Sequence, residues 1–404
     1  MKWSELPREA RAYILYHALV APVLFSWYII PYSLLESGYS VLQVGVIYTA
    51  VSLLSLPLTF IVGRVYTYRN LKAGLMIIDV LGSVSIFLFA AAIWMNSPLL
   101  VAASLLIDKL SGPLYPLYPA YERAVYPEDR MKEALIWHMI VPEASLAVVL
   151  PVMGYLFGVT CVSLECVMWG LASLGIYELV LVAYLWLALK PVTLSEESEE
   201  KEDGGFIEDV KSVALALKGK LKLYFLSSML YLLAWSFLPS FVTVNFIVEE
   251  YGGTLFHVSL FESAISLASI ASMKLCEHIP ESRAFQALMG SALSVTATTL
   301  LISLRPSFPI LVLLAFAVRM GDATWFLFNR NWFFKLISKE EAALVSSAVS
   351  TLRSGFSLLL PALTGLLANF DPKLPYMVGF ILFLSTIPFY LAAWREQKEK
   401  ALKS

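Results

Sequence analysis

Long apolar runs separated by short polar connections make up most of the chain. About 20 apolar residues cross a bilayer core of about 30 Å as a helix, and twelve runs reach that length. They cover residues 12–34, 41–63, 72–95, 98–121, 133–157, 164–189, 222–247, 254–275, 284–304, 308–333, 342–368 and 374–394. The pattern predicts an all-α polytopic membrane protein with twelve transmembrane helices.

Composition supports this prediction. Of the 404 residues, 59% are hydrophobic and only 15% are charged, and the mean hydropathy is +0.73. A soluble protein cannot bury so much apolar surface. The net charge of −2 averages a segregated distribution, so it gives no reason to expect a nucleic-acid partner. The three cysteines form no metal or redox pattern. Cys161 and Cys166 could pair, although the favoured interpretation is that they are unpaired and serve as small apolar residues of a helix.

The longest hydrophilic segment lies between the sixth and seventh runs. It contains the stretch SEESEEKEDGG, which is too charged to form a core. We therefore predict a six-helix bundle over residues 1–189, a charged cytoplasmic linker over 190–221, and a second bundle over 222–404. The remainder of the linker has apolar residues at helical spacing and is expected to lie on the inner membrane surface.

Lysines and arginines predict the orientation. If the N-terminus is inside, all but five of the 29 lysines and arginines fall in inner connections or tails. Only Arg305 and Lys373 fall outside, while Lys109, Arg319 and Arg353 fall within the runs. Because inner loops are enriched in basic residues, we expect a multi-pass protein of the cytoplasmic membrane with both termini cytoplasmic.

The chain is internally duplicated. Residues 98–122 match 309–333 at a shift of 211, and 133–156 match 343–366 at a shift of 210, placing Pro151 over Pro361. Each copy carries ionised residues deep in apolar helices. Asp108 corresponds to Arg319, and Glu143 corresponds to Arg353. An even number of spans per copy makes the two repeats parallel, related by an axis along the membrane normal.

Twelve spans in two sixes, a charged central linker and inner termini resemble the major facilitator superfamily. That family has a Gly-x-x-x-Asp-Arg-x-Gly-Arg-Arg-type loop after its second span. Here Gly63, Arg64 and Arg69 remain, but Thr67 stands in place of the aspartate. The family's fourth span often has Arg-x-x-x-Gly, whereas Asp108 precedes Gly112 here. The Gly-Pro-x-x-Gly-Gly motif of its antiporters is reduced to Pro151 and Gly154.

The resemblance implies a central cavity lined by spans 1, 4, 7 and 10, with spans 5 and 11 beside them. Asp108 and Glu143 would then face Arg319 and Arg353 at the depth where substrates bind. Three interpretations stay open: substrate or proton binding, a gating latch, and neutralisation within one bundle. Asp322 lies three residues from Arg319 on one helix face, so these two side chains could neutralise each other. Glu143 is the preferred proton-coupling residue, because no cation is near it in sequence.

Other candidates carry less weight. Glu262 is an even choice between function and packing, and Trp27, Tyr115 and Trp235 are candidate cavity aromatics. The gate and hinge candidates are Gly63, Arg64, Arg69, Pro113, Pro116, Pro119, Pro151 and Pro361. Pro113, Pro116 and Pro119 should kink the inner half of the fourth span. Asp79 and Glu178 are interpreted as structural, Asp79 because a nearby arginine-rich loop could satisfy it.

The resulting hypothesis is a secondary active transporter that moves a small organic solute by alternating access. Proton coupling and export are favoured. The alternatives are a proton-coupled importer of an organic anion or nutrient, and a non-transporting scaffold with a transporter fold. No GxxxxGK[ST], HExxH or GxSxG motif is present, so neither an ATPase nor an intramembrane enzyme is expected. We expect that transport uses a proton or ion gradient and no cofactor. We also expect the protein to lie in a lipid bilayer and to act as a monomer.

Overall fold

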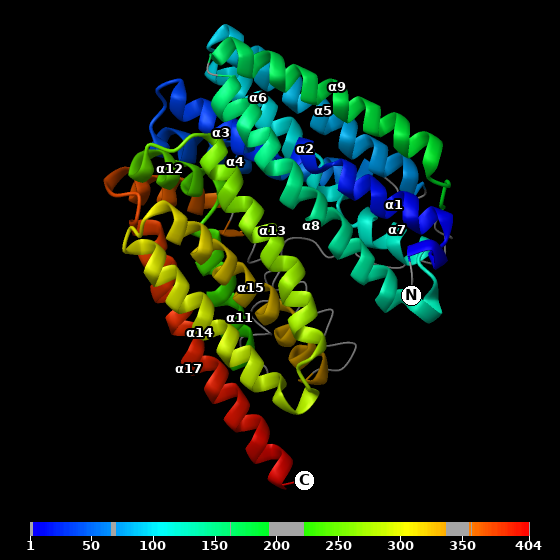
Figure 1. Ribbon diagram of the computed structural model, residues 1–404, viewed down its shortest axis with the longest axis vertical. Helices are drawn as coiled ribbons and strands as arrows, with labels where there is room; N and C mark the ends of the chain where they lie inside the picture. Colours follow the sequence, from blue (N-terminus) through cyan, green and yellow to red (C-terminus); the bar gives the residue numbers. More distant parts are fainter. Residues whose placement is uncertain are drawn as a thin grey trace. The chain divides into compact units, whose positions relative to one another are not determined.

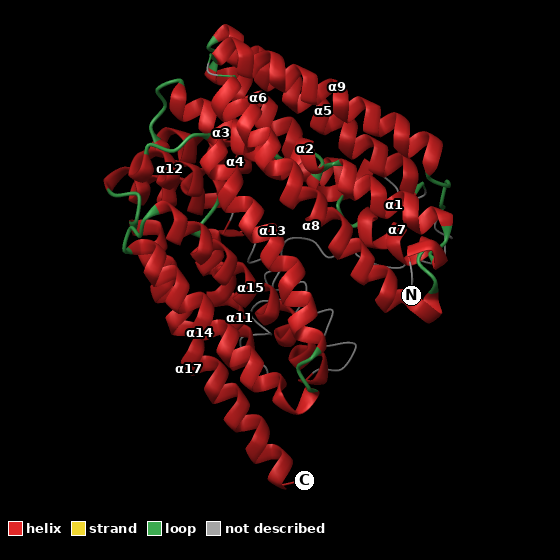
Figure 2. Ribbon diagram, viewed as in Figure 1, coloured by secondary structure: helices red, strands yellow, loops and turns green. Residues whose placement is uncertain are grey.

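The computed structural model describes residues 3–65, 70–161, 163–193, 222–336, 355–356 and 358–403. Within these ranges the chain consists of helices and their connections, with no strand (Figure 2). Nine of the described helices are long and apolar enough to cross a membrane, or ten if one bent pair is counted as a single span. The chain is therefore a multi-pass membrane protein, as its hydropathy predicted.

Residue contacts divide the chain into two compact units, the first comprising Met1–Glu200 and Gly252–Ser266, the second Lys201–Tyr251 and Leu267–Ser404. The first, or N-terminal, unit contains nine α-helices and the beginning of α13 (Figure 1). They are α1 (Arg8–Leu19), α2 (Ala21–Leu24), α3 (Ser26–Glu36), α4 (Val41–Val65), α5 (Leu71–Met95), α6 (Pro98–Lys109), α7 (Leu117–Val125), α8 (Met131–Tyr155) and α9 (Leu164–Ala188). A 3₁₀ turn, Gly112–Leu114, lies between α6 and α7, and a π-helical segment, Leu156–Thr160, extends α8.

The second, or C-terminal, unit is built from the remaining helices. They are α11 (Lys222–Ser236), α12 (Ser240–Tyr251), the later part of α13 (Leu255–Glu277), α14 (Ala284–Ser303), α15 (Phe308–Leu336) and α17 (Leu374–Lys403). A shorter apolar helix, Leu358–Phe370, precedes α17. The predicted linker, apart from residues 190–193, and most of the eleventh predicted span lie outside the described residues. The other eleven predicted spans all fall on helices.

Three predicted spans are divided into shorter helices, and the seventh is sharply bent. The first consists of α1, α2 and α3, the fourth of α6, the 3₁₀ turn and α7, and the seventh of α11 and α12, which meet at 48°. Proline explains the fourth break, because Pro113 and Pro116 each remove a backbone donor within the gap between α6 and α7. The corresponding α15 runs unbroken through 29 residues. The kink predicted from the prolines is thus confirmed, and it belongs to one repeat only.

Polar caps set the ends of several helices in the N-terminal unit. The Asn70 side chain accepts a hydrogen bond from the Ala73 N–H at the start of α5. Ser97 caps α6 in the same way, with Pro98 at the first helical position. Asn96 between them has φ 47°, the left-handed conformation that asparagine tolerates at a helix end. Asn96 and Ser97 together produce the tight turn between α5 and α6.

α5 is the central helix of the N-terminal unit, with α6 and α9 packed against it (Figure 1). Towards α6, the Ser85 and Ser104 hydroxyls each donate to the other residue's backbone carbonyl, at 2.9 and 2.8 Å. Towards α9, the Ser83 hydroxyl donates to the Gly175 carbonyl oxygen at 2.9 Å. Small polar residues of this kind let membrane helices approach closely while satisfying their hydroxyls.

A second close approach joins the end of α8 to the beginning of α13. A methyl group at Gly158 would lie 2.6 Å from the backbone nitrogen of Phe256. One at Gly154 would overlap the Ser259 hydroxyl and lie 2.9 Å from the Leu255 carbonyl oxygen. Glycines four residues apart allow two backbones to touch, and the Ser263 hydroxyl adds a hydrogen bond to the Ala147 carbonyl oxygen at 2.6 Å.

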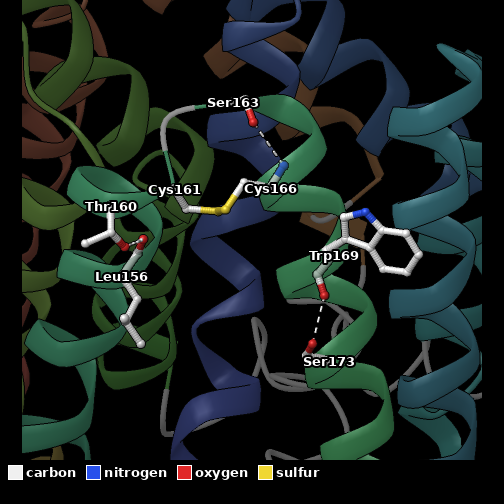
Figure 3. Close-up of a disulfide and its surroundings, with 7 residues drawn as sticks. All are labelled: Leu156, Thr160, Cys161, Ser163, Cys166, Trp169 and Ser173. Atoms are coloured by element: carbon white, nitrogen blue, oxygen red, sulfur yellow. Dashed lines mark hydrogen bonds between the residues drawn. A yellow bond between two sulfur atoms is a disulfide. The ribbon is translucent and has the colours of Figure 1, made fainter.

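The connection between α8 and α9 contains a disulfide between Cys161 and Cys166 (Figure 3). The preferred interpretation of these cysteines as unpaired helix residues was therefore wrong, because the turn brings their Cα atoms within 5.3 Å. The Ser163 hydroxyl between them accepts a hydrogen bond from the Cys166 N–H and caps α9.

Two connections of the C-terminal unit are joined by an ionic clasp. Arg305, which follows α14, contacts Glu250 at 2.9 Å and Asp371 at 2.6 Å. Lys373 also contacts Asp371 through its ammonium group and its backbone N–H. Arg305 and Lys373, the two cations predicted outside the membrane, thus share one carboxylate.

We expect this clasp to make stability depend on pH. Partial burial alone would raise the pKa of Asp371, but hydrogen bonds from the Lys373 N–H and from Arg305 outweigh it and lower the pKa. Its contribution is therefore complete above the unfolded pKa of about 3.9 and is lost as the pH falls through the lower folded value. Apparent unfolding temperatures of the wild type and Asp371→Asn should converge in acid. A difference that stays constant with pH would show that the clasp does not stabilise the fold.

Candidate functional site

The charged residues of α15 form a polar cluster in the C-terminal unit. The Arg319 guanidinium donates to Asp322 Oδ2 at 2.8 Å and to the Ser269 hydroxyl of α13 at 2.9 Å. The Tyr231 hydroxyl of α11 donates to Asp322 Oδ1 at 2.9 Å. Three helices therefore hold one ion pair, and both carboxylate oxygens of Asp322 have a donor.

The ion pair is only partly enclosed. The Arg319 side chain is 37% exposed and that of Asp322 is 16% exposed. Behind the pair, the Tyr231 ring stacks on Trp325 with 3.5 Å between ring centroids, and Phe383 of α17 packs edge-on against Tyr231. Aromatic packing of this kind fixes the phenol hydroxyl in place. The arrangement fits a charge pair that is accessible from one side and rigidly supported from the other.

In the N-terminal unit, Asp108 lies where α6 ends. Its backbone carbonyl accepts from the Ser111 N–H and hydroxyl, and the Ser111 and Tyr115 hydroxyls are hydrogen-bonded to each other at 3.1 Å. Lys109 interacts electrostatically with Asp108. Asp108 therefore lies at the break of the fourth span, where a broken membrane helix is tolerated only against protein or a wet cavity.

Two buried acids that the sequence analysis interpreted as structural lie nearby. Asp79 on α5 accepts a hydrogen bond from the Tyr16 hydroxyl of α1 at 2.6 Å. The side chains of Arg64 and Arg69, in the loop expected to satisfy Asp79, are not described, so that expectation stays a prediction. Glu178 on α9 is 7% exposed, and it interacts electrostatically with Asp79 and Asp108. The sequence around Glu178 is a long apolar helix and did not predict that Glu178 lies near Asp79 and Asp108. Their proximity depends on how α5 and α9 pack.

A cluster of aromatic and histidine side chains extends from these acids. His17 and His138 have ring centroids 4.6 Å apart, and Tyr13 packs edge-on against both. The His138 ring nitrogen Nδ1 is hydrogen-bonded to the Tyr126 hydroxyl and lies 3.6 Å from Glu122. Each histidine ring therefore contacts other rings, although Nε2 of His17 is buried without a hydrogen-bond partner among the described residues.

The remaining predicted residues fall in different environments. Glu143 on α8 and Glu262 on α13 are half-buried, and each has a partner in the structure. Trp27 is 53% exposed and Tyr115 is 46% exposed. Trp235 instead packs into the core of the C-terminal unit against Phe383.

Pro151 lies inside α8, and Pro361 lies in the helix Leu358–Phe370. Pro119 lies within α7, just beyond the break in the fourth span. Gly63 and Arg64 lie in the last turn of α4, where the side chains are not described. Arg69 and Arg353 lie outside the described residues. The predicted juxtaposition of Asp108 and Glu143 with Arg319 and Arg353 therefore stays a prediction.

Interrupted membrane helices that carry a few half-buried charges are typical of membrane transporters. The profile of the Major Facilitator Superfamily matches residues 15–354, so the chain belongs to that family. No relative of curated function matches the sequence with significance.

Solved structures show the same fold. The nucleoside transporter NupG matches at 14% identity with a TM-score of 0.66, covering 96% of this chain and 98% of its own. A bacterial homologue of the iron transporter ferroportin, in an inward-facing state, matches at 14% identity with a TM-score of 0.70 and the same coverages. The human organic anion transporter MFSD10 matches at 14% identity with a TM-score of 0.62, covering 96% of this chain and 100% of its own. At such identity the likeness extends to the fold alone.

Proposed function

We propose that the protein moves a small organic solute across the cytoplasmic membrane and couples this movement to protons. The observation that carries the proposal is the Arg319–Asp322 pair, held by Tyr231 and Ser269 within an apolar helix and left partly exposed. A charge in a membrane helix costs several kcal/mol on most scales, which makes such residues functional candidates. Protonation of Asp322 would release the guanidinium, so one proton would change the charge that a solute meets.

The paired state of Arg319 bears on the substrate. Because Asp322 and Ser269 already satisfy this guanidinium, an anionic solute would have to displace a carboxylate to bind it. The importer of an organic anion is therefore the less supported alternative. Similar structures include nucleoside, metal and organic anion transporters, and this variety fits a fold whose solute is set by local side chains.

Export is favoured by the remnant of the antiporter motif in α8. Pro151 lies within that helix, and Gly154 is one of the two glycines at which this segment closely approaches α13. A close helix contact next to a proline suits a segment that changes its packing during transport. This feature supports exchange of the solute for protons, with Glu143, about two helical turns before Pro151, as a coupling acid in addition to Asp322.

The test combines a thermal-shift screen with flux measurements. Organic cations, organic anions, nucleosides and sugars are screened for stabilisation of the purified protein, and hits are followed in proteoliposomes with an imposed pH gradient. We expect flux that the gradient drives and that Glu143→Gln uncouples while leaving binding intact. Glu165→Gln, at an exposed position of α9, is the matched control. Saturable flux that ignores the pH gradient would refute proton coupling, and binding without flux would favour a scaffold.

The proposed orientation has its own test at the disulfide. Disulfides persist mainly in oxidising compartments, which supports an outer position for the connection between α8 and α9 and inner positions for both termini. After mild reduction in intact cells, a membrane-impermeant maleimide should label Cys161 and Cys166. Cys161→Ser/Cys166→Ser, which retains only half-buried Cys276, is the control and should stay unlabelled. If the reduced wild type is labelled only after permeabilisation, the connection between α8 and α9 lies on the inner side and the proposed orientation is wrong.

A further inference from the structure

Two carboxyl groups in the N-terminal unit lie buried without a cation. Asp79 on α5 is 5% exposed and Glu178 on α9 is 7% exposed. Asp79 Oδ2 and Glu178 Oε2 have no hydrogen-bond partner, and neither residue forms an ion pair among the described residues. The cost of leaving a carboxylate unpaired in a low-dielectric interior is several kcal/mol, so this pair must be neutralised by something that binds to it.

Packing of α5 against α9 brings the two groups to one place. Gly82 lies one helical turn from Asp79, on the same face of α5. A methyl group at position 82 would overlap the Glu178 carboxyl group. Because Gly82 has no side chain, the Glu178 carboxyl group fits against the backbone of α5 at this position. The Tyr16 hydroxyl, donating to Asp79 Oδ1, leaves Oδ2 open on the other side.

Among the described residues, no cation forms an ion pair with either carboxyl group, and the groups that interact with the site come from several helices. Tyr16 and His17 come from α1, Asp108 and Lys109 from α6, Tyr115 and Tyr118 from the 3₁₀ turn to α7, and His138 from α8. Lys109 interacts with Asp108. Lys72, the other lysine on α5, donates to the Trp186 and Leu189 carbonyl oxygens at the far end of α9. Lys72 and Lys109 are therefore engaged elsewhere.

We propose that Asp79 and Glu178 form a further proton-binding site inside the N-terminal unit, which loads and releases a proton separate from that of Asp322. A hydronium ion gives its proton to Glu178 Oε2 or Asp79 Oδ2, leaving a water molecule, and no other bond changes. The proton is held between two acids on helices that pack together, so its release restores like-charge repulsion between α5 and α9. This inference rests on the proposed proton coupling and adds to it a proton site outside the predicted cavity residues.

Infrared difference spectroscopy of the purified protein in nanodiscs tests the site without any solute. Spectra from acidic to alkaline pH, in choline chloride and in sodium chloride, follow the C=O stretch of protonated carboxyl groups. We expect a band that disappears on raising the pH. Because interacting acids titrate as a pair, Asp79→Asn or Glu178→Gln should each remove about half of its amplitude or more. Exposed Glu165 on α9 provides the control substitution Glu165→Gln, which should leave the band unchanged.

A milder variant separates the site from general damage to the fold. Tyr16→Phe removes only the hydrogen bond to Asp79, so it should shift the frequency of the band without removing it. A band that persists at every pH would identify permanently neutral structural acids. A band indifferent to Asp79→Asn and Glu178→Gln would belong to another residue, and a titration that moves with sodium would reveal a sodium site. Each of these three results overturns the proposal. A titrating pair in a protein whose flux ignores pH gradients would refute proton coupling while leaving the binding site intact.

Discussion

Gly158→Ala should destabilise the protein severely. The added methyl group would lie 2.6 Å from the Phe256 backbone nitrogen and 3.0 Å from that of Leu255. Both are backbone atoms near the start of α13, so no side chain can rotate away. Overpacking of a tight contact costs about 1–3 kcal/mol, and the upper end is expected here because the helices themselves must separate. The apparent unfolding temperature and the yield of monodisperse protein in detergent measure the effect.

Two other glycines provide the controls. Gly290 on α14 and Gly112 after α6 both face open space, with no atom within 4 Å of an added methyl group. Gly290→Ala should be neutral or stabilise by up to about 1 kcal/mol, since alanine is the better helix former. Gly112→Ala should have little effect. If Gly158→Ala behaves like these two, the contact between α8 and α13 is looser than described.

Asp322→Asn should remove most of the pH dependence of transport and also lower stability. It leaves Arg319 with a neutral partner, and removing one partner of a fully buried ion pair costs about 3–5 kcal/mol. The Arg319 side chain is 37% exposed, so solvent screening reduces the expected cost to about 1–2 kcal/mol. Solute flux under an imposed pH gradient, together with unfolding temperature, measures both effects.

The double variant Arg319→Gln/Asp322→Asn distinguishes stability from coupling. Removing both charges leaves no unpaired ion, so most of the lost stability should return. The pH dependence of flux should not return, because the titrating carboxyl group is gone. Glu277→Gln, at an exposed end of α13, controls for loss of a carboxylate. Recovery of pH-dependent flux in the double variant would remove the Arg319–Asp322 pair from the coupling mechanism.

Interrupted helices are found in spans that the family resemblance assigns to the central cavity. Of spans 1, 4, 7 and 10, which the resemblance assigns to the cavity, the first three are interrupted in the structure. The sequence analysis predicted an interruption only in the fourth span, where three prolines fall within seven residues. The bend between α11 and α12 has a single proline, Pro239, which the sequence analysis did not single out.

The sequence alone determined the features that depend on local composition. Bilayer thickness sets the length of an apolar helix, so hydropathy located the helices to within a few residues. Helical periodicity placed Arg319 and Asp322 on one face, and the structure joins them at 2.8 Å. The family followed from the duplicated twelve-span architecture, and the match over residues 15–354 confirms it.

Only the tertiary structure decided which distant side chains meet. Tyr231 and Ser269 reach the α15 ion pair from other helices, and neither is marked by its own sequence context. The sequence showed Glu178 only as an isolated charge on a peripheral helix. In the structure its carboxyl group lies against Gly82 of α5. A residue's position along a helix fixes its depth and its face, whereas its partners depend on the rotation and packing of neighbouring helices. Those are set by close contacts between small residues, such as Gly158 against the backbone of α13.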